Sequence, residues 1–265
     1  MRAADHALLA PLRAAPRDAA VVTDFDGTLS PIVDDPARAL PLPGVVDTLH
    51  ALAARYGRVA VVSGRPVRYL RHRLEVDHRP PTPLFLSGLY GIESFEHGVE
   101  HVHPIALPFR DAVDDVAARA EAAAPTGVGV ERKGFSVTLH VRTGPEHLEW
   151  AREWSRTAAG AAGLAVHHGR MSVELRPPVD VDKGSVVGDL VAGTRAACFL
   201  GDDLGDLPAF DALDRLVLAD ADAHALRIAV RSDEAPPELL ERADLLVDGP
   251  AGSLELLRAL LDERS

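Results

Sequence analysis

Two aspartates with a single residue between them occur in the segment Asp24-Phe25-Asp26-Gly27-Thr28, just after the apolar run Ala19 to Val22. Carboxylates two residues apart on a strand project to the same side, where their repulsion favours a cation between them, such as Mg²⁺. The Gly and Thr that follow suit a tight exit from a strand, whose backbone N–H groups can face an anion. The segment therefore predicts a metal site beside a phosphate-binding turn, and with it phosphoryl transfer through an aspartyl-phosphate.

Short apolar runs alternate along the chain with stretches of helical period, which is typical of a parallel sheet with crossover helices. The further predicted strands are Val59 to Val62, Leu84 to Leu86, Ala196 to Leu200, Leu216 to Leu218 and Leu245 to Val247. Ligands of such a sheet bind at the carboxyl ends of its strands. Polar segments stand at these ends: Ser63-Gly64-Arg65-Pro66, Ser87-Gly88 and Gly201-Asp202-Asp203-Leu204-Gly205-Asp206. We therefore expect an α/β fold in which these segments converge on one edge.

The middle of the chain departs from this pattern. Helical stretches at 108–124 and 145–162 each precede a pair of segments with alternating apolar residues, within 128–141 and 164–175. This order predicts a small α+β domain over residues 107–179. The domain is then inserted into a Rossmann-like core that is made of residues 1–106 and 180–265.

Composition narrows the possible partners and compartment. Acidic residues outnumber basic ones by 40 to 28, a net charge of −12, so we expect no nucleic-acid partner. No window has the roughly 20 apolar residues of a membrane helix, and the run Leu8-Leu9-Ala10 is too short for a signal peptide. With Cys198 as the single cysteine, these features indicate a cytoplasmic protein without a membrane partner. The oligomeric state stays open, and a monomer is compatible with the sequence.

Four motifs occur in a characteristic order: Asp24-Phe25-Asp26-Gly27-Thr28, Ser63-Gly64-Arg65, Lys183-Gly184, and Gly201-Asp202-Asp203 with Asp206. The set resembles the haloacid-dehalogenase-type phosphatases and, within them, the trehalose-6-phosphate phosphatase family. Only 34 residues separate Thr28 from Ser63, whereas 117 separate Arg65 from Lys183, so the inserted domain lies between the second and third motifs. Haloacid-dehalogenase-type proteins with a cap domain inserted at this position resemble phosphatases that act on sugar phosphates. A cap that closes over the site would exclude large phosphoproteins.

The resemblance implies roles for the residues of these motifs. Asp24 would be the nucleophile, and Asp26 would protonate the leaving sugar oxygen and then activate water. The phosphoryl group would be held by Ser63 and Lys183, and the substrate also by Thr28, Gly64 and Arg65. Mg²⁺ would be bound by Asp24, Asp26 (through its carbonyl) and Asp202, with Asp206 orienting the ligands.

Segments of the inserted domain resemble the cap signature of the same family: Glu131-Arg132-Lys133, Leu139-His140-Val141-Arg142 and Met171 to Pro177. By this resemblance the sugar hydroxyls contact Glu131, Lys133, Arg142 and Glu174. Such side chains can bind hydroxyls through charge-assisted hydrogen bonds. The alternative is a solvated strand face with paired charges. No role is assigned to Tyr90, to Asp203, or to His97, His101 and His103, which a polar hairpin explains.

The expected reaction is Mg²⁺-dependent hydrolysis of trehalose 6-phosphate, a small-molecule sugar phosphate, to trehalose and phosphate. Two alternatives remain: a phosphatase of another sugar phosphate, of the sucrose-phosphate or mannosyl-phosphoglycerate type, and a non-catalytic regulatory domain of the same fold. The chain departs from the family pattern at Gly205 and Leu207, where the family commonly has Thr and Glu. This departure leaves the predicted metal ligands in place.

Overall fold

The computed structural model describes residues 7–33, 36–79, 83–169 and 171–262. The chain divides into two compact units, one formed by Met1–Glu100 with Val181–Ser265 and the other by His101–Asp180. Each unit has a hydrophobic core of its own. Among the described residues, no helix is both long enough and apolar enough to cross a membrane.

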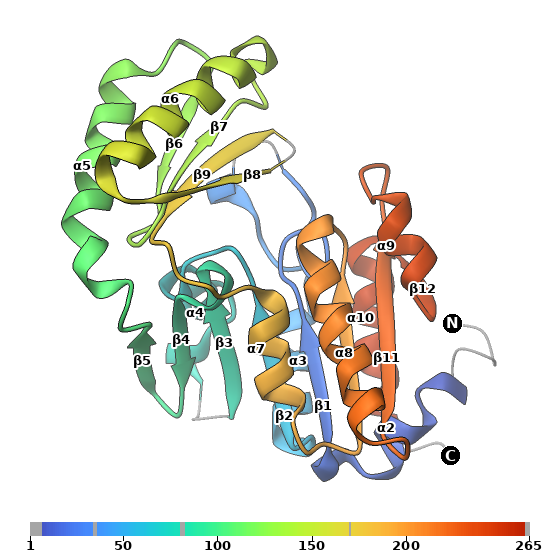
Figure 1. Cartoon of the computed structure of the whole chain (residues 1–265). Coiled ribbons are helices and arrows are strands. Elements are labelled where there is room, and N and C mark those ends of the chain that lie inside the picture. The colour runs from blue at the N-terminus through green and yellow to red at the C-terminus, as the bar shows by residue number, and fades with distance from the viewer. Residues whose placement is uncertain (1–6, 34–35, 80–82, 170, 263–265) are drawn as a thin grey trace. The chain divides into compact units, whose positions relative to one another are not determined.

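The first unit is built around a sheet with the strand order β12-β11-β10-β1-β2-β3-β4-β5 (Figure 1). Its strands are β1 Ala19–Thr23, β2 Arg58–Val62, β3 Leu84–Gly88, β4 Glu93–Glu96, β5 Val99–Val102, β10 Ala196–Gly201, β11 His224–Arg231 and β12 Leu245–Asp248. The strands from β12 to β3 run parallel, and β4 returns antiparallel to β3. The predicted parallel sheet is thus confirmed, with β1 at its centre between β10 and β2.

Helices cover both faces of this sheet, which explains why every residue of β1 is buried. The helices of the unit are α2 Ala10–Ala14, α3 Val45–Arg55, α4 Val67–Arg73, α7 Lys183–Val191, α8 Leu207–Ala219, α9 Pro237–Arg242 and α10 Gly249–Ala259. Val21 of β1 belongs to the core that includes residues of α3, α4 and α10. Its neighbour Val22 belongs to the core on the opposite face, with residues of α7, α8 and α9. Figure 1 shows α7 and α8 on the near side of the sheet.

The prediction of a strand at Leu216 to Leu218 is wrong. These residues form the last turn of α8, in which Leu216 is buried while Leu218 is 86% exposed. The strand that follows β10 is β11, eight residues further along, where buried Leu226, Ile228 and Val230 alternate with other side chains. A short apolar run at a helix end has no period of its own, which is why it resembled a strand.

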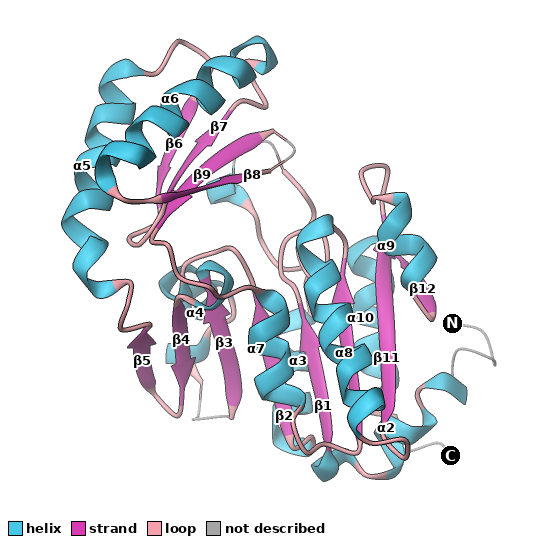
Figure 2. Ribbon diagram, in the orientation of Figure 1, coloured by secondary structure: helices cyan, strands magenta, loops and turns pink. Residues whose placement is uncertain are grey.

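The second unit contains a four-stranded antiparallel sheet with the order β6-β7-β9-β8 (Figure 2). Its elements are α5 Arg110–Ala123, β6 Gly129–Arg132, β7 Val137–His140, α6 Leu148–Ala162, β8 Ala165–His168 and β9 Ser172–Arg176. One face of the sheet packs its apolar side chains against α5 and α6. The register places Glu131, Thr138, Glu174 and His167 in one row across the strands. This row of polar residues alternates with the apolar residues of the core, so it lies on the other face.

Candidate active site

The predicted motifs of the first unit meet at one edge of its sheet. Asp24 follows β1, Ser63 follows β2 and Asp202 follows β10, and these are adjacent parallel strands. The backbone N–H of Asp24 donates to the carbonyl of Leu200 at 2.8 Å, which continues the pairing of β1 with β10 to the strand end. The carboxyl ends of three strands therefore bring these side chains together, as the sequence predicted.

Lys183 links two of the aspartates. Its Nζ lies 2.8 Å from Oδ1 of Asp24 and 2.6 Å from Oδ1 of Asp206, and all three side chains are buried. Lys183 is the first residue of α7, whose start is fixed by a capping box between Asp182 and Ser185. Burial by itself would lower the pKa of Lys183, but the carboxylates of Asp206 and Asp24 hold it well above its ordinary value. The ammonium is therefore a permanent positive charge at this edge.

Asp206 organises the turn that carries Asp202. Its Oδ2 accepts hydrogen bonds from the backbone N–H groups of Asp202 at 2.8 Å and of Asp203 at 3.1 Å, while Oδ1 faces Lys183. The side chain is fully buried. Both oxygens of Asp206 are thus engaged, and they fix the backbone of the turn on which Asp202 stands.

Asp202 lies against the turn that follows Asp26. The hydroxyl of Thr28 is 3.4 Å from its Oδ1, which is long for a hydrogen bond. Gly27 has φ +75°, and a Cβ built on it would come within 1.9 Å of Oδ2 of Asp202. Only glycine meets both conditions, the left-handed backbone and the close approach of a carboxylate.

The buried carboxylates fit a divalent cation. Carboxylate oxygens of Asp24, Asp202 and Asp206 lie within 4.8 Å of one another. Burial raises the pKa of Asp202 from 3.8 to about 10, with a further contribution from Asp24, and burial also raises the pKa values of Asp24 and Asp206. Ionising all three thus requires positive charge beyond that of Lys183. A divalent metal ion supplies such charge, and oxygen donors are the ligands that a hard cation prefers.

We expect the substitution Asp202→Asn to stabilise the metal-free protein, and more so at higher pH. The pKa of Asp202 is raised on folding, so the folded state retains a proton that the unfolded state releases above the ordinary value of 3.8. The free energy of unfolding of the wild type therefore falls as the pH rises towards about 10, and the variant lacks this loss. Thermal denaturation in EDTA at about pH 5 and about pH 8 should show a melting-temperature gain that grows to a few degrees.

Added Mg²⁺ should make the melting temperature of the wild type higher than that of Asp202→Asn, because the ion stabilises the wild type more than the variant. The matched control is Asp222→Asn, since Asp222 is an exposed aspartate in a turn outside this group of buried carboxylates. Equal melting temperatures of wild type and Asp202→Asn at both pH values would contradict the expectation.

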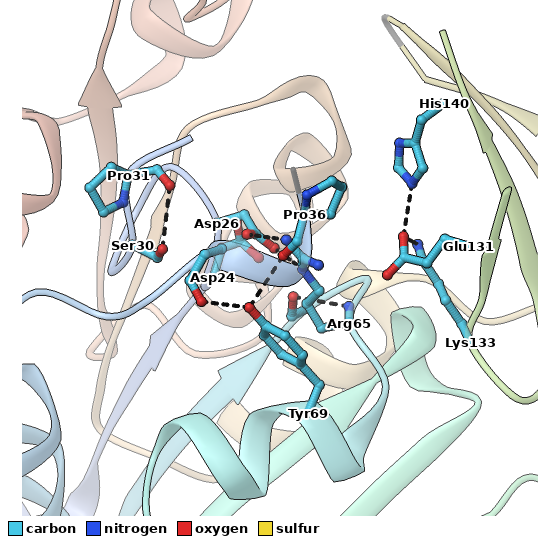
Figure 3. Close-up of polar contacts among 12 residues, drawn as sticks. Asp24, Asp26, Ser30, Pro31, Pro36, Arg65, Tyr69, Glu131, Lys133 and His140 are labelled. Carbon is cyan, nitrogen blue, oxygen red and sulfur yellow. Dashed lines mark hydrogen bonds and ion pairs between the residues drawn. The ribbon is translucent and has the colours of Figure 1, made fainter. Parts of the chain in front are cut away.

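Asp26 and the second motif form a separate pair. Oδ2 and Oδ1 of Asp26 accept hydrogen bonds from Nε and Nη2 of Arg65, each at 2.7 Å (Figure 3). The backbone N–H of Arg65 also donates to the hydroxyl of Ser63 at 3.2 Å. The ring of Tyr90 covers Gly64, where a Cβ would come within 2.6 Å of it. Tyr90 thus shapes the loop that carries Ser63, a function that the sequence did not assign.

In the second unit, three of the predicted sugar-contact residues form one cluster. Nζ of Lys133 lies 3.4 Å from Oε1 of Glu174 and 3.9 Å from Oε2 of Glu131. Lys133 and Glu174 are buried, which excludes the alternative of a solvated strand face for these two residues. Arg142, the fourth predicted residue, follows β7 and is half-buried.

Two further residues of this cluster were not singled out from the sequence. The hydroxyl of Ser136 donates to Oε1 of Glu174 at 2.6 Å. Nε2 of His140 is 2.8 Å from Oε2 of Glu131, a contact drawn in Figure 3. His140 could have been found from its position between the apolar Leu139 and Val141, because alternation along a strand then puts it on the polar face of the sheet.

Comparisons with known proteins agree with this architecture. The family model described as trehalose-phosphatase matches residues 22–239. The trehalose-phosphate phosphatase of Mycobacterium leprae is 34% identical over 233 residues, which is 82% of this chain and 52% of that protein. The chain spans about half the length of the curated trehalose-phosphate phosphatases of M. leprae, M. marinum and M. ulcerans, all of which it matches.

Solved structures show the same fold. A crystal structure of a trehalose-6-phosphate phosphatase related protein superimposes with a TM-score of 0.75 at 25% identity, covering 91% of this chain and 97% of that one. A haloacid dehalogenase-like hydrolase from Bacteroides thetaiotaomicron gives a TM-score of 0.58 at 15% identity, covering 91% and 98%. The fold is therefore of the haloacid dehalogenase type, as predicted.

Proposed function

Because the chain belongs to the trehalose-phosphatase family, we propose that it hydrolyses trehalose 6-phosphate to trehalose and inorganic phosphate. The observation that carries the proposal is the contact of Lys183 with both Asp24 and Asp206 beside Asp202. Phosphoryl transfer requires little beyond positioning and charge neutralisation, and this buried cluster supplies charges of both signs. Burying such charges is costly, which favours a catalytic use of the cluster over a purely structural one.

In the proposed reaction Asp24 is the nucleophile and Asp26 is the general acid and base. An oxygen of the Asp24 carboxylate attacks phosphorus, the bond from phosphorus to the sugar oxygen breaks, and Asp26 gives that oxygen its proton. Water then attacks the phosphorus of the aspartyl-phosphate and passes a proton to Asp26. The bond between phosphorus and Asp24 breaks, which releases phosphate and restores both carboxyl groups.

Other residues of the first unit hold the groups that react. Lys183, Ser63 and Thr28 donate hydrogen bonds to phosphoryl oxygens. Thr28 and Ser63 are both buried, and the hydroxyl of Thr28 lies beside Asp202. Asp24, Asp202 and the carbonyl of Asp26 would bind a divalent ion, which we propose is Mg²⁺. When bound, this ion supplies positive charge that offsets the negative charge of the phosphoryl group. Cys198 is buried and free, which fits the reducing cytoplasm in which we propose that the enzyme acts.

The sugar part of the substrate is assigned to Glu131, Lys133, Arg142 and Glu174. Sugar hydroxyls both donate and accept hydrogen bonds, so they suit a cluster in which carboxylates and an ammonium already pair. Rigid β-strands hold the two glutamates, since β6 carries Glu131 and β9 carries Glu174, and Lys133 directly follows β6. We propose that this cluster, rather than the acidic one, selects the substrate.

We expect Glu174→Gln to raise KM for trehalose 6-phosphate by about tenfold or more, because a hydrogen bond to a carboxylate is worth roughly 1.5–3 kcal/mol. The value of kcat should stay within about threefold of the wild type, since the residue acts in binding. Steady-state phosphate release measures both constants. Glu153→Gln, on the exposed side of α6, is the matched control, and an unchanged KM in Glu174→Gln would contradict the assignment.

A panel of phosphate esters tests the proposed function itself. With Mg²⁺ present, kcat/KM for trehalose 6-phosphate should exceed the values for sucrose 6-phosphate, mannosyl-3-phosphoglycerate and glucose 6-phosphate by about a hundredfold, equivalent to roughly 2.7 kcal/mol. A preference for another ester would identify a sister phosphatase. Absence of hydrolysis for every ester would favour the regulatory domain.

A further inference from the structure

The acid/base aspartate is held by a buried guanidinium. The Arg65 side chain is 9% exposed and donates two parallel hydrogen bonds to Asp26, which is itself 35% exposed. A planar guanidinium that binds both oxygens fixes the plane of the carboxylate as well as its position. Each carboxylate oxygen keeps a second lone pair. Asp26 can therefore exchange a proton while Arg65 sets the direction in which it faces.

The ring of Tyr69 in turn supports Arg65. Cζ of Arg65 lies 4.7 Å from the centroid of this ring, and Cζ of Arg73 lies 5.0 Å from it. Both distances are within the range of cation–π attraction. Figure 3 shows the Arg65 guanidinium close to both Asp26 and Tyr69. Arg65 thus has an electrostatic partner on the ring as well as on the carboxylate.

Tyr69 is itself fixed by contacts at its edge and its hydroxyl. The ring of Phe25 meets it edge to face, with centroids 5.9 Å apart and planes at 89°. The hydroxyl of Tyr69 donates to the carbonyl of Ala39 at 2.7 Å. Since Phe25 stands between Asp24 and Asp26 in the chain, one ring touches both the segment of the acid/base and the arginine that orients it.

We propose that Tyr69 is a positioning residue for Asp26 and acts through Arg65. This inference rests on the proposed function, because it concerns the efficiency of proton transfer to the leaving oxygen. Without the ring, Arg65 keeps its charge but loses the surface that sets its orientation, so the carboxyl group of Asp26 is less often directed at that oxygen. The alternative is that the side chain of Tyr69, which is part of α4, merely fills space.

Leaving groups of different basicity separate the two possibilities. A sugar alkoxide needs a proton as it departs, whereas p-nitrophenolate does not, and kcat/KM reports only steps up to the departure of that group. In Tyr69→Leu, kcat/KM for trehalose 6-phosphate, or for whichever sugar phosphate the wild type hydrolyses, should fall about tenfold or more. The value for p-nitrophenyl phosphate should stay within about threefold. Equal losses for both esters would overturn the proposal.

Tyr69→Phe is the matched control, since it retains the ring and loses only the contacts of the hydroxyl with the carbonyls of Ala39 and Pro36. It should keep the wild-type ratio of the two kcat/KM values. Tyr69→Met, which has bulk but no aromatic face, replaces the leucine variant if that variant fails to fold.

A measurement without turnover separates this proposal from the proposed function. In NMR spectra of protein with isotope-labelled arginine, the Nε–H signal of Arg65, identified by its loss in Arg65→Lys, should be protected from exchange in the wild type and in Tyr69→Phe. It should lose that protection in Tyr69→Leu and Tyr69→Met. Unchanged protection in these variants would refute the role of Tyr69. Loss of protection in a protein that hydrolyses no ester would support the contact while refuting the proposed function.

Discussion

Replacing Asp24 with asparagine is expected to stop phosphate release while leaving the fold intact. The amide oxygen of asparagine is a poor nucleophile, so kcat should fall by about four orders of magnitude or more, as for other residues that form covalent intermediates. The fold should survive because burial raises the pKa of Asp24 well above its ordinary value, so removing this carboxylate also removes a costly buried charge. Phosphate release and circular dichroism measure the two outcomes.

The matched control is Asp189→Asn, since Asp189 is an exposed aspartate on α7. This variant should keep wild-type activity. Substantial hydrolysis by Asp24→Asn, above what deamidation or contaminating wild type can supply, would refute Asp24 as the nucleophile.

Replacing Lys183 with methionine is expected to abolish activity and to destabilise the protein by about 3–5 kcal/mol. The methionine fills a similar space, but Asp24 and Asp206 lose the ammonium that lies 2.8 Å and 2.6 Å from their oxygens. Uncompensated carboxylates must then be protonated or exposed to water, and both are unfavourable at neutral pH. Urea denaturation gives the free energy of unfolding, and part of the loss should be recovered with Mg²⁺.

Arg195→Met removes one positive charge from an exposed position after α7 and controls for the change in net charge. It should alter stability by less than about 0.5 kcal/mol. A stable and active Lys183→Met protein would show that the ammonium is dispensable. The role assigned to Lys183 would then be wrong.

The sheet and the convergence of its motifs could be predicted because both follow from the chain's local pattern. Buried runs such as Ala196 to Leu200 indicate parallel strands, and the carboxyl ends of such strands share one edge. The strand β11 was missed because polar residues, such as Arg227, interrupt its apolar residues. The apolar run that ends at the exposed Leu218 was predicted to be a strand instead, although it is the end of α8. Tertiary burial, which the local pattern does not contain, decides between the two.

The acidic cluster was predicted almost entirely, whereas the support of Asp26 was not. The proximity of Asp24, Lys183 and Asp202 could be predicted from the motifs, since each residue stands at the end of a strand or the start of a helix. The pairing of Asp26 with Arg65 depends on side-chain direction, and their 39-residue separation gives no sign of it. Tyr69 lies inside a short helix, where an aromatic residue normally indicates only packing.

The central claim is that Asp24 accepts the phosphoryl group of a sugar phosphate, and chemical trapping tests it most directly. Wild-type protein is mixed with trehalose 6-phosphate, quenched in acid during turnover and reduced with borohydride, which converts an aspartyl-phosphate into homoserine. Peptide mass spectrometry should then find homoserine at position 24, dependent on substrate and absent from Asp24→Asn. Homoserine at another aspartate, or none at all while phosphate is being released, would contradict the account.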